Sequence, residues 1–245
     1  MIRPAVLILA ALAAFPGNAA ERRFGNTGFS QVVVETSANV AITKGGFAVT
    51  ATGAQADLDR LELRQDGATL RIGHKKGSDW RWNSKPVAIA VSLPALSAVT
   101  VSGSGDVAAD QVSGAAAALR ISGSGDLAVQ TVKGTALSLG LSGSGNLAVG
   151  SAAAETVAVS ISGSGDVAVA GRCTTLDARL SGSGDLAANR LNCTNATVST
   201  SGSGDVSVHA SGQVTARTSG SGDVVVTGGA RCTSRSSGSG VIRCN

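Results

Sequence analysis

The sequence has 245 residues, a formal net charge of +4, 43% hydrophobic residues and only 2% aromatic residues, with 33 glycines and no tyrosine. Because globular cores normally depend on aromatic side chains, a core of this composition has to be built from Val, Leu, Ile and Ala. The glycines lack the every-third-residue period of collagen, and no basic stripe interleaved with aromatic residues is present to bind nucleic acid.

The N-terminal segment, residues 1–20, has the pattern of a secretory signal sequence. Arg3 supplies the positive start, residues 5–15 are apolar, and small residues end the segment at Ala19 and Ala20. We therefore expect residues 1–20 to be removed and the mature chain to be exported, to the periplasm or the cell surface of a bacterium. A retained helical anchor is the alternative, but the apolar run is shorter than the about 20 residues that span a bilayer. No later stretch is long and apolar enough to span a membrane as a helix, so we expect no transmembrane segment in the mature chain.

Residues 21–101 form the next region, and we expect it to be rich in β-structure. Apolar residues alternate with polar ones in several segments of irregular spacing, which is typical of half-buried strands. The sequence QDGATL at 65–70 has the Asp-Gly signature of a tight hairpin. Because a stack of strands needs a cover over its open edge, we expect residues 21–101 to cap the repeats that follow.

One segment of this region, HKKGSDWRWNSK at 74–85, contains both tryptophans and several cations. A strand would place the two tryptophans on one face, because they are two residues apart. Exposed Trp beside cations suits stacking on sugars or on anionic glycans. The candidate ligand-binding residues are Trp80, Trp82, Lys75, Lys76 and Arg81. The alternative, which we favour, is that both tryptophans pack over the N-terminal core.

Residues 102–245 are dominated by a repeat that begins with SGSG. The copies start at Ser102, Ser122, Ser142, Ser162, Ser181, Ser201, Ser219 and Ser237, separated by 20, 20, 20, 19, 20, 18 and 18 residues. Apolar residues alternate with polar ones around each copy, so that Leu119 and Ile121 share one side while Arg120 lies on the other. A period of two predicts extended chain with one buried face. The two glycines of each copy fall in the buried phase, where the coil turns or where two backbones approach closely.

This period predicts an all-β fold, a parallel β-solenoid. We expect about eight coils of 18–20 residues, each with two strands and two turns, stacked at the usual strand spacing of about 4.8 Å. Antiparallel hairpins fit less well, because their turns alternate between two kinds. The last SGSG copy is followed by Val241 instead of Asp, so we expect the terminal coil to be atypical, as capping repeats are.

Several motifs together resemble one known family. They are FSQVVVETSANVAITKGGFAVTATG, DLDRLELRQDGATLRIGHKKG, KPVAIAVSLPALSAVTVSGSGDV and the SGSG-[DN]-[VL] repeats, and together they cover about residues 24–245. With these motifs the chain resembles the bacterial head GIN domain proteins, described as auto-transporter adhesins. The resemblance implies a right-handed parallel β-helix at the bacterial envelope or outside it. It supplies no catalytic residues.

Six of the SGSG copies are followed by Asp, and we expect these residues to form a row along one edge. The row contains Asp106, Asp126, Asp166, Asp185, Asp205 and Asp223, and Asn146 interrupts it. Neighbouring carboxylates about 5 Å apart repel each other by roughly 0.8 kcal/mol in water, and bound Ca²⁺ would relieve this repulsion. Asp and Asn also stabilise turns by bonding to their own backbone, and Asn146 suits that role equally well. We therefore favour a structural role and expect no cofactor, with weak calcium binding or a ligand surface as alternatives.

The carboxylate row also raises the question of glycoside hydrolysis, because retaining glycosidases hold two carboxyl groups about 5–5.5 Å apart. Such catalysis requires two carboxyl groups in different environments, whereas identical coils provide identical environments. We therefore expect the protein not to be an enzyme. A polysaccharide hydrolase or lyase ranks third, after the two interpretations of its function given below.

The four cysteines are expected to form two disulfides in an exported chain. Cys173 and Cys193 are one coil apart, and turns at nearly the same offset bring their Cα atoms to about 5–6 Å, within disulfide range. Cys232 and Cys244 would then close the last coil. We interpret both disulfides as structural bonds that protect the C-terminal end of the solenoid from local unfolding.

Together these features predict an exported, non-enzymatic β-solenoid that acts as an envelope-associated binding or adhesion module. Repeated identical groups suit a repetitive surface ligand such as a glycan, because many weak contacts add up through avidity. The alternative is a structural or assembly protein whose partner is another envelope protein.

Overall fold

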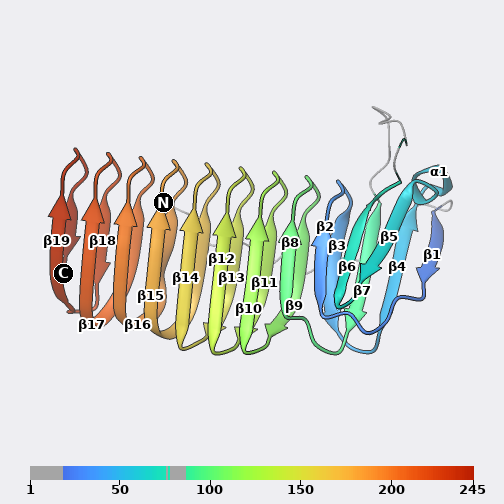
Figure 1. Ribbon diagram of the computed structural model, residues 1–245, viewed down its shortest axis with the longest axis horizontal. Coiled ribbons are helices and arrows are strands. Elements are labelled where there is room, and N and C mark those ends of the chain that lie inside the picture. Colours follow the sequence, from blue (N-terminus) through green and yellow to red (C-terminus); the bar gives the residue numbers. More distant parts are fainter. Residues whose placement is uncertain (1–18, 76, 78–86) are drawn as a thin grey trace.

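The computed structural model of the chain describes residues 19–75, 77 and 87–245. The chain winds into an elongated β-solenoid of about 7 turns, with parallel strands stacked side by side along the long axis (Figure 1). The number of turns is close to the eight expected. The coil is right-handed, in agreement with the usual hand of parallel crossovers.

The N-terminal region contains seven strands and one short helix among its described residues. They are β1 (Ala20–Phe24), β2 (Gln31–Val34), β3 (Asn39–Lys44), β4 (Ala48–Gly53), α1 (Gln55–Leu58), β5 (Leu61–Asp66), β6 (Thr69–His74) and β7 (Ala88–Leu93).

The remaining strands form the stacked coils, which begin with β8, just before the first SGSG copy at Ser102. They are β8 (Ala98–Val101), β9 (Val107–Ser113), β10 (Ala116–Ile121), β11 (Leu127–Lys133), β12 (Ala136–Leu141), β13 (Leu147–Ala153), β14 (Thr156–Ile161), β15 (Val167–Leu180), β16 (Leu186–Thr200), β17 (Val206–Thr218), β18 (Val224–Thr227), β19 (Arg231–Ser236) and β20 (Ile242–Cys244).

Within each repeat, the strand before SGSG lies on one face of the solenoid and the strand after it lies on the other. We call these the first face and the second face. On the first face β8, β10, β12 and β14 pair parallel, and on the second face β9, β11 and β13 do so. The ladders are in register, so Leu119 lies beside Leu139 and Leu139 beside Val159. In β15, β16 and β17 the chain passes one corner of the coil without leaving the ladder, which produces strands of 14, 15 and 13 residues, and in the next coil β18 and β19 are separate again.

The core is a column of aliphatic side chains inside the coils. Leu119 and Ile121 are 0% and 1% exposed, whereas Arg120 between them is exposed. Burial of one such aliphatic side chain contributes about 1.5–3 kcal/mol relative to exposure. Phe29 is the one aromatic side chain in the buried core of the described residues, so the prediction of an aliphatic core is confirmed.

The glycines of the SGSG turns lie where the backbones of successive coils touch. A Cβ atom added to Gly123 would overlap the carbonyl oxygen of Gly103, and one added to Gly143 would overlap that of Gly123. Their φ angles are not in the left-handed region. The close approach of two backbones therefore requires glycine here, as the alternation of the repeat predicted.

Parallel stacking begins within the N-terminal region. β2 pairs with β8 on the first face, and β3 pairs with β9 on the second face. Beyond them, β6 pairs parallel with β2, and β7 pairs parallel with β3. The layer formed by β6 and β7 therefore lies farther from the repeats than β2 and β3 do, although it comes later in the chain (Figure 1).

Antiparallel strands and α1 close this end of the solenoid. β5 and β6 form the hairpin predicted from Asp66-Gly67, with Gly67 at φ 54°, and β4 runs antiparallel to both β7 and β1. Leu58, at the end of α1, is 0% exposed and belongs to the core. A search of residues 19–75, 77 and 87–245 found no helix with the length and apolar character needed to cross a membrane.

Candidate binding surfaces

The Asp row joins neighbouring coils through the backbone. Asp106 Oδ1 accepts the N–H of Asp126 at 3.0 Å, and Asp126 Oδ1 accepts the N–H of Asn146 at 2.7 Å. Asn146 Oδ1 in turn accepts the N–H of Asp166 at 3.1 Å. The same bond continues from Asp166 to Asp185 (2.9 Å), from Asp185 to Asp205 (2.8 Å), from Asp205 to Asp223 (2.8 Å) and from Asp223 to Val241 (2.8 Å).

This hydrogen-bond pattern differs from the predicted one, in which each side chain bonds to its own turn. Coils stacked about 4.8 Å apart place the next backbone N–H within reach of the carboxylate, so the bond crosses between coils. Asn39 begins the row, because its Oδ1 accepts the N–H of Asp106 at 3.1 Å. Sequence reasoning missed Asn39 because it follows Thr-Ser-Ala instead of Gly-Ser-Gly. Val241 ends the row, since its side chain has no acceptor.

Calcium binding by the six aspartates stays a prediction. One oxygen of each carboxylate already accepts a backbone N–H. Within the described part of the chain, no group of three or more His, Cys, Asp or Glu side chains is arranged to hold a metal ion. Asp223 is the one member of the row with a cationic partner among the described residues, because Arg243 Nη1 lies 3.6 Å from its Oδ2.

Most of the predicted Trp-containing site lies outside the described residues, namely Lys76, Trp80, Arg81 and Trp82. Lys75 is described and follows β6. Its Nζ donates to the carbonyl oxygen of Asp59 at 2.6 Å, and its backbone N–H donates to that of Arg60 at 2.8 Å. Lys75 is therefore tied to the segment that leads from α1 into β5.

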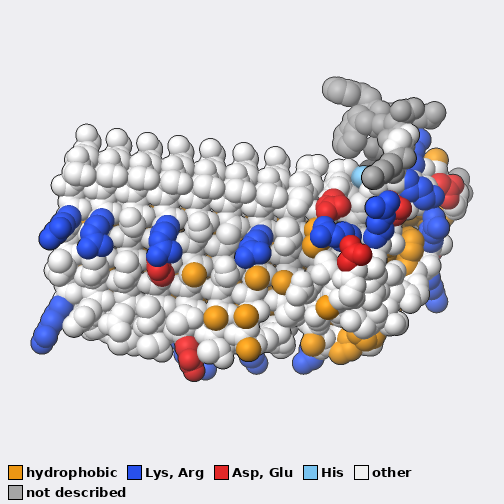
Figure 2. Space-filling view, viewed as in Figure 1, with side chains coloured by type: hydrophobic (Ala, Val, Ile, Leu, Met, Phe, Trp, Pro, Cys, Tyr) orange, Lys and Arg blue, Asp and Glu red, His pale blue; other side chains and the backbone are white. Residues whose placement is uncertain are grey.

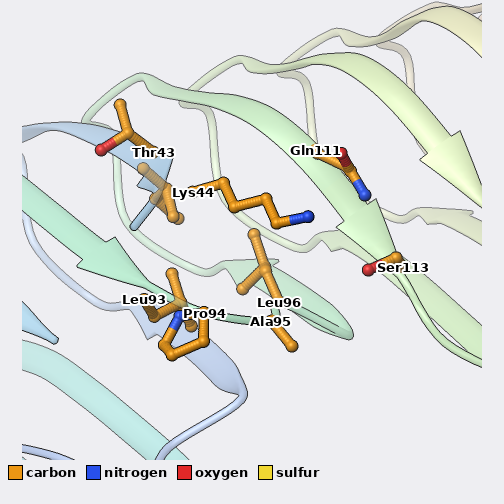
Figure 3. Close-up of a pocket in the computed structure, with 9 residues that line it drawn as sticks. Thr43, Lys44, Leu93, Pro94, Ala95, Leu96, Gln111 and Ser113 are labelled. Atoms are coloured by element: carbon orange, nitrogen blue, oxygen red, sulfur yellow. The ribbon is translucent and has the colours of Figure 1, made fainter. Parts of the chain in front are cut away.

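A small hollow lies where β3, β9 and the segment between β7 and β8 meet (Figure 3). Lys44, Leu93, Leu96 and Gln111 are among the residues that line it. Its volume of about 10 Å³ accommodates about one water molecule, which is too little for an organic ligand.

Both predicted disulfides are confirmed. Cys173 bonds to Cys193 with their Cα atoms 4.5 Å apart, and Cys232 bonds to Cys244 with their Cα atoms 6.4 Å apart. The prediction that Cys173 and Cys193 occupy turns is wrong, because both lie inside strands and face each other in the β15–β16 ladder. At this corner the ladder continues through the bend, so the bridge links two paired strands.

A row of arginines crosses the first face, and we call it the arginine row. It consists of Arg120, Arg179, Arg217 and Arg235, which share one register position with Thr100, Gly140, Ser160 and Ser199. All four arginine side chains are exposed, and Figure 2 shows basic side chains in a line along this face. Sequence reasoning missed the row, although each of these arginines stands two residues before an SGSG copy.

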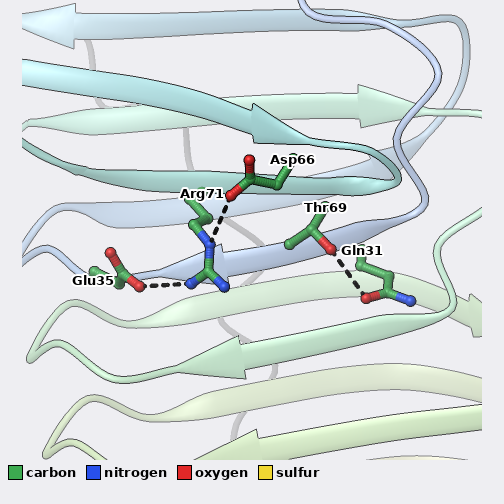
Figure 4. Close-up of polar contacts among 5 residues, drawn as sticks. All are labelled: Gln31, Glu35, Asp66, Thr69 and Arg71. Carbon is green, nitrogen blue, oxygen red and sulfur yellow. Dashed lines mark hydrogen bonds and ion pairs between the residues drawn. The ribbon is translucent and has the colours of Figure 1, made fainter.

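Most of this positive charge is not neutralised. Arg179 pairs with Asp177 at 2.8 Å, whereas Arg120, Arg217 and Arg235 form no ion pair with any described residue. Arg71 of β6 occupies the same register position in the N-terminal region. It contacts the carboxylates of Glu35 at 2.9 Å and Asp66 at 3.7 Å (Figure 4). The positive charge in this register position is therefore neutralised by carboxylates near the N-terminal end, whereas three of the four arginines along the repeats have no ion pair with a described residue.

Two serine columns lie next to the arginine row, at the edge formed by the SGSG turns. The first serine of each copy lies two residues after the arginine position. The second serines are exposed and form no side-chain hydrogen bond with the described part of the chain; they are Ser104, Ser124, Ser144, Ser164, Ser183, Ser203, Ser221 and Ser239. Their hydroxyl groups are thus available to a bound molecule.

Fold and surface together define a β-solenoid protein that presents the same polar side chains once per coil along its length. The chain belongs to the family described as "Putative auto-transporter adhesin, head GIN domain", whose profile matches residues 28–230. This agrees with the family that the sequence motifs resemble. A search of the curated proteins found no match.

Several crystal structures are similar to this chain. A putative adhesin from Parabacteroides distasonis is 20% identical with a TM-score of 0.87, and a putative lipid-binding protein from the same species is 22% identical with a TM-score of 0.83. A putative adhesin from Parabacteroides merdae is 17% identical with a TM-score of 0.85. Each comparison covers 94% of this chain and 98% of the other. At these identities the likeness shows the shared fold.

Proposed function

We propose that this protein is an exported, non-enzymatic adhesion module that binds a repetitive ligand of the bacterial envelope or surface, such as a glycan. The observation that carries the proposal is the in-register repetition of exposed side chains, once per coil, on a rigid stack of strands. A single exposed contact is weak, but a polymer that engages several coils binds through avidity. The adhesin description of the family supports this role.

Export is supported by two independent features. Residues 1–20 have the pattern of a cleaved signal, and both cysteine pairs form disulfides, which persist in oxidising compartments. We therefore place the mature protein in the periplasm or at the cell surface. Its non-enzymatic character is supported by the structural bond that every carboxylate of the Asp row makes to the backbone N–H of the next coil.

The test is a thermal-shift and calorimetric screen of the mature protein against envelope polysaccharides, Ca²⁺ and EDTA. We expect at least one polysaccharide to raise the melting temperature, and we expect no response to Ca²⁺ or EDTA because of the structural role of the Asp row. A Trp80→Ala/Trp82→Ala double variant shows whether the tryptophans contribute. Weaker polysaccharide binding with unchanged melting of the free protein assigns them to the site, whereas lowered melting assigns them to the core.

A structural or assembly protein is the second candidate, and β19 favours it. β19 pairs with β17 on one side and lies at the C-terminal edge of the first face, where another protein can add a strand. A screen with no response to any polysaccharide, together with an envelope protein that binds in stoichiometric amount, would replace the adhesion proposal with this one.

A further inference from the structure

We propose that the arginine row is the binding track for a linear anionic polysaccharide that lies along the solenoid axis, across the first-face strands. This inference rests on the proposed function and names the chemical class of the ligand. It uses a different set of residues from the tryptophan-containing segment.

The spacing of the row suits a polymer with regularly placed charges. Arg217 and Arg235 lie on neighbouring strands of the ladder, which are about 4.8 Å apart. Arg179 is two strands from Arg217, or about 10 Å, and Arg120 is three strands from Arg179, or about 14 Å. A chain with an acidic group on each sugar, or on every second sugar, presents charges at such intervals along one line.

The arginine row keeps its positive charge because most acidic residues of the repeats lie elsewhere. Residues 102–245 contain nine basic and nine acidic residues, so the region has no net charge. Six of the acidic residues belong to the Asp row, which precedes the strands of the second face. The first face therefore carries exposed guanidinium groups with few carboxylates beside them, and Figure 2 shows the line of basic side chains on this face.

The guanidinium groups of the row determine which chemical groups of a ligand can bind. Arg binds carboxylate, sulfate or phosphate groups through two parallel N–H bonds. One exposed pair contributes only about 0–1 kcal/mol, so a small anion would bind weakly at any single arginine. Measurable affinity requires several pairs at once, which a single long polymer provides.

The surroundings of the row favour a sugar polymer over other polyanions. Ser160 and Ser199 occupy the same register position as the arginines, and the serine columns lie beside them, so hydroxyl groups are available to sugar hydroxyls. Ser199, Arg217, Ser219, Arg235 and Ser237 line one shallow open depression. Phe47 and Val241 are the large exposed apolar side chains among the described residues, and neither belongs to the arginine row. The face thus offers neither aromatic groups to stack on bases nor an apolar patch to enter a bilayer.

The test uses the full mature chain and three probes: sodium polygalacturonate, neutral dextran and vesicles of phosphatidylglycerol. The variant is Arg120→Gln/Arg217→Gln/Arg235→Gln, which removes the three arginines without an ion pair. The control is Arg71→Gln, which removes an arginine from the same register position where carboxylates already neutralise it. Melting temperatures of both variants confirm that each is folded.

We expect polygalacturonate to bind the wild type and the control with similar affinity, and to bind the triple variant at least about tenfold more weakly. Binding should also weaken as salt is raised, because the pairs are exposed.

Polygalacturonate binding that the triple variant retains would overturn the inference. So would binding to the vesicles alone, which would assign the row to a lipid surface. If dextran binds and polygalacturonate does not, the anionic track is wrong while the adhesion proposal stands. If no polysaccharide binds, in this test or in the broader screen, both the anionic track and the adhesion proposal are wrong.

Discussion

At the scale of single residues, the repeat is set by the glycines of the SGSG turns. Gly123 and Gly143 face the carbonyl oxygens of the preceding coil so closely that no side chain fits between them. Gly140 belongs to the same coil as Gly143 but lies on the exposed first face, where an added Cβ would meet Arg120 Cγ at an ordinary contact distance of 3.5 Å. The surroundings therefore require glycine at position 143 but not at position 140, although the two are three residues apart.

This contrast predicts opposite effects of the same substitution. Gly143→Ala should destabilise the protein by about 3 kcal/mol or more, because two stacked coils have to separate locally to admit a methyl group. Gly140→Ala should be neutral or slightly stabilising, because alanine loses less backbone freedom on folding. Urea denaturation of both variants measures the difference in unfolding free energy. Equal stability of the two variants would contradict the close-approach explanation.

At the scale of structural elements, the side chains of the Asp row act as connectors between coils. Each side chain supplies an acceptor for the backbone N–H that begins the next coil's second-face strand. The row starts at Asn39 in the N-terminal region and ends at Val241. The connection is therefore directional, and the terminal coil offers no acceptor to a further coil.

The connector role predicts which substitutions of Asp166 are tolerated. Asp166→Ala removes the acceptor for the N–H of Asp185 and should lower stability by about 1 kcal/mol. Asp166→Asn keeps an acceptor, as Asn146 does one coil earlier, and removes one charge from the row. This variant should be at least as stable as the wild type. Chemical denaturation distinguishes them, and a loss of stability in both would show that the charge matters more than the hydrogen bond.

At the scale of the whole molecule, the two ends of the solenoid are closed in different ways. Antiparallel strands and Leu58 of α1 cover the N-terminal end. Towards the C-terminal end, Thr200 and Thr218 occupy the inward register position held by Leu and Ile in earlier coils, and Thr200 Oγ1 is buried without a partner among the described residues. These coils gain less from burial, and the bridge between Cys232 and Cys244 adds a covalent constraint near them.

We therefore expect a Cys232→Ala/Cys244→Ala variant to fray locally. In a quasi-one-dimensional stack, loss of an end constraint affects the nearest coils most. Backbone amides of β18 and β20 should exchange with deuterium faster in the variant, while those of β10 and β12 keep their protection. Hydrogen-exchange mass spectrometry measures both regions at once. Uniformly faster exchange along the whole chain would show that the solenoid unfolds as one unit.

The period of the sequence was sufficient to predict the β-solenoid, the aliphatic core, the inward glycines and both cysteine pairs. It was sufficient because side chains alternate with period two and coils recur with a nearly constant length, and both are properties of local chain geometry. The Asp-Gly pair likewise predicted the β5–β6 hairpin, because turn geometry depends on adjacent residues.

Only the tertiary structure decided which residues of different coils lie side by side. Register placed Arg120, Arg179, Arg217 and Arg235 in one row, although the intervals between them are unequal in the sequence. It also added Asn39 to the Asp row and set β6 and β7 outside β2 and β3. These features arise from pairing between strands far apart in the chain. The arginines did carry a local signal, their shared position two residues before an SGSG copy, whereas Asn39 and the order of β6 and β7 carry none.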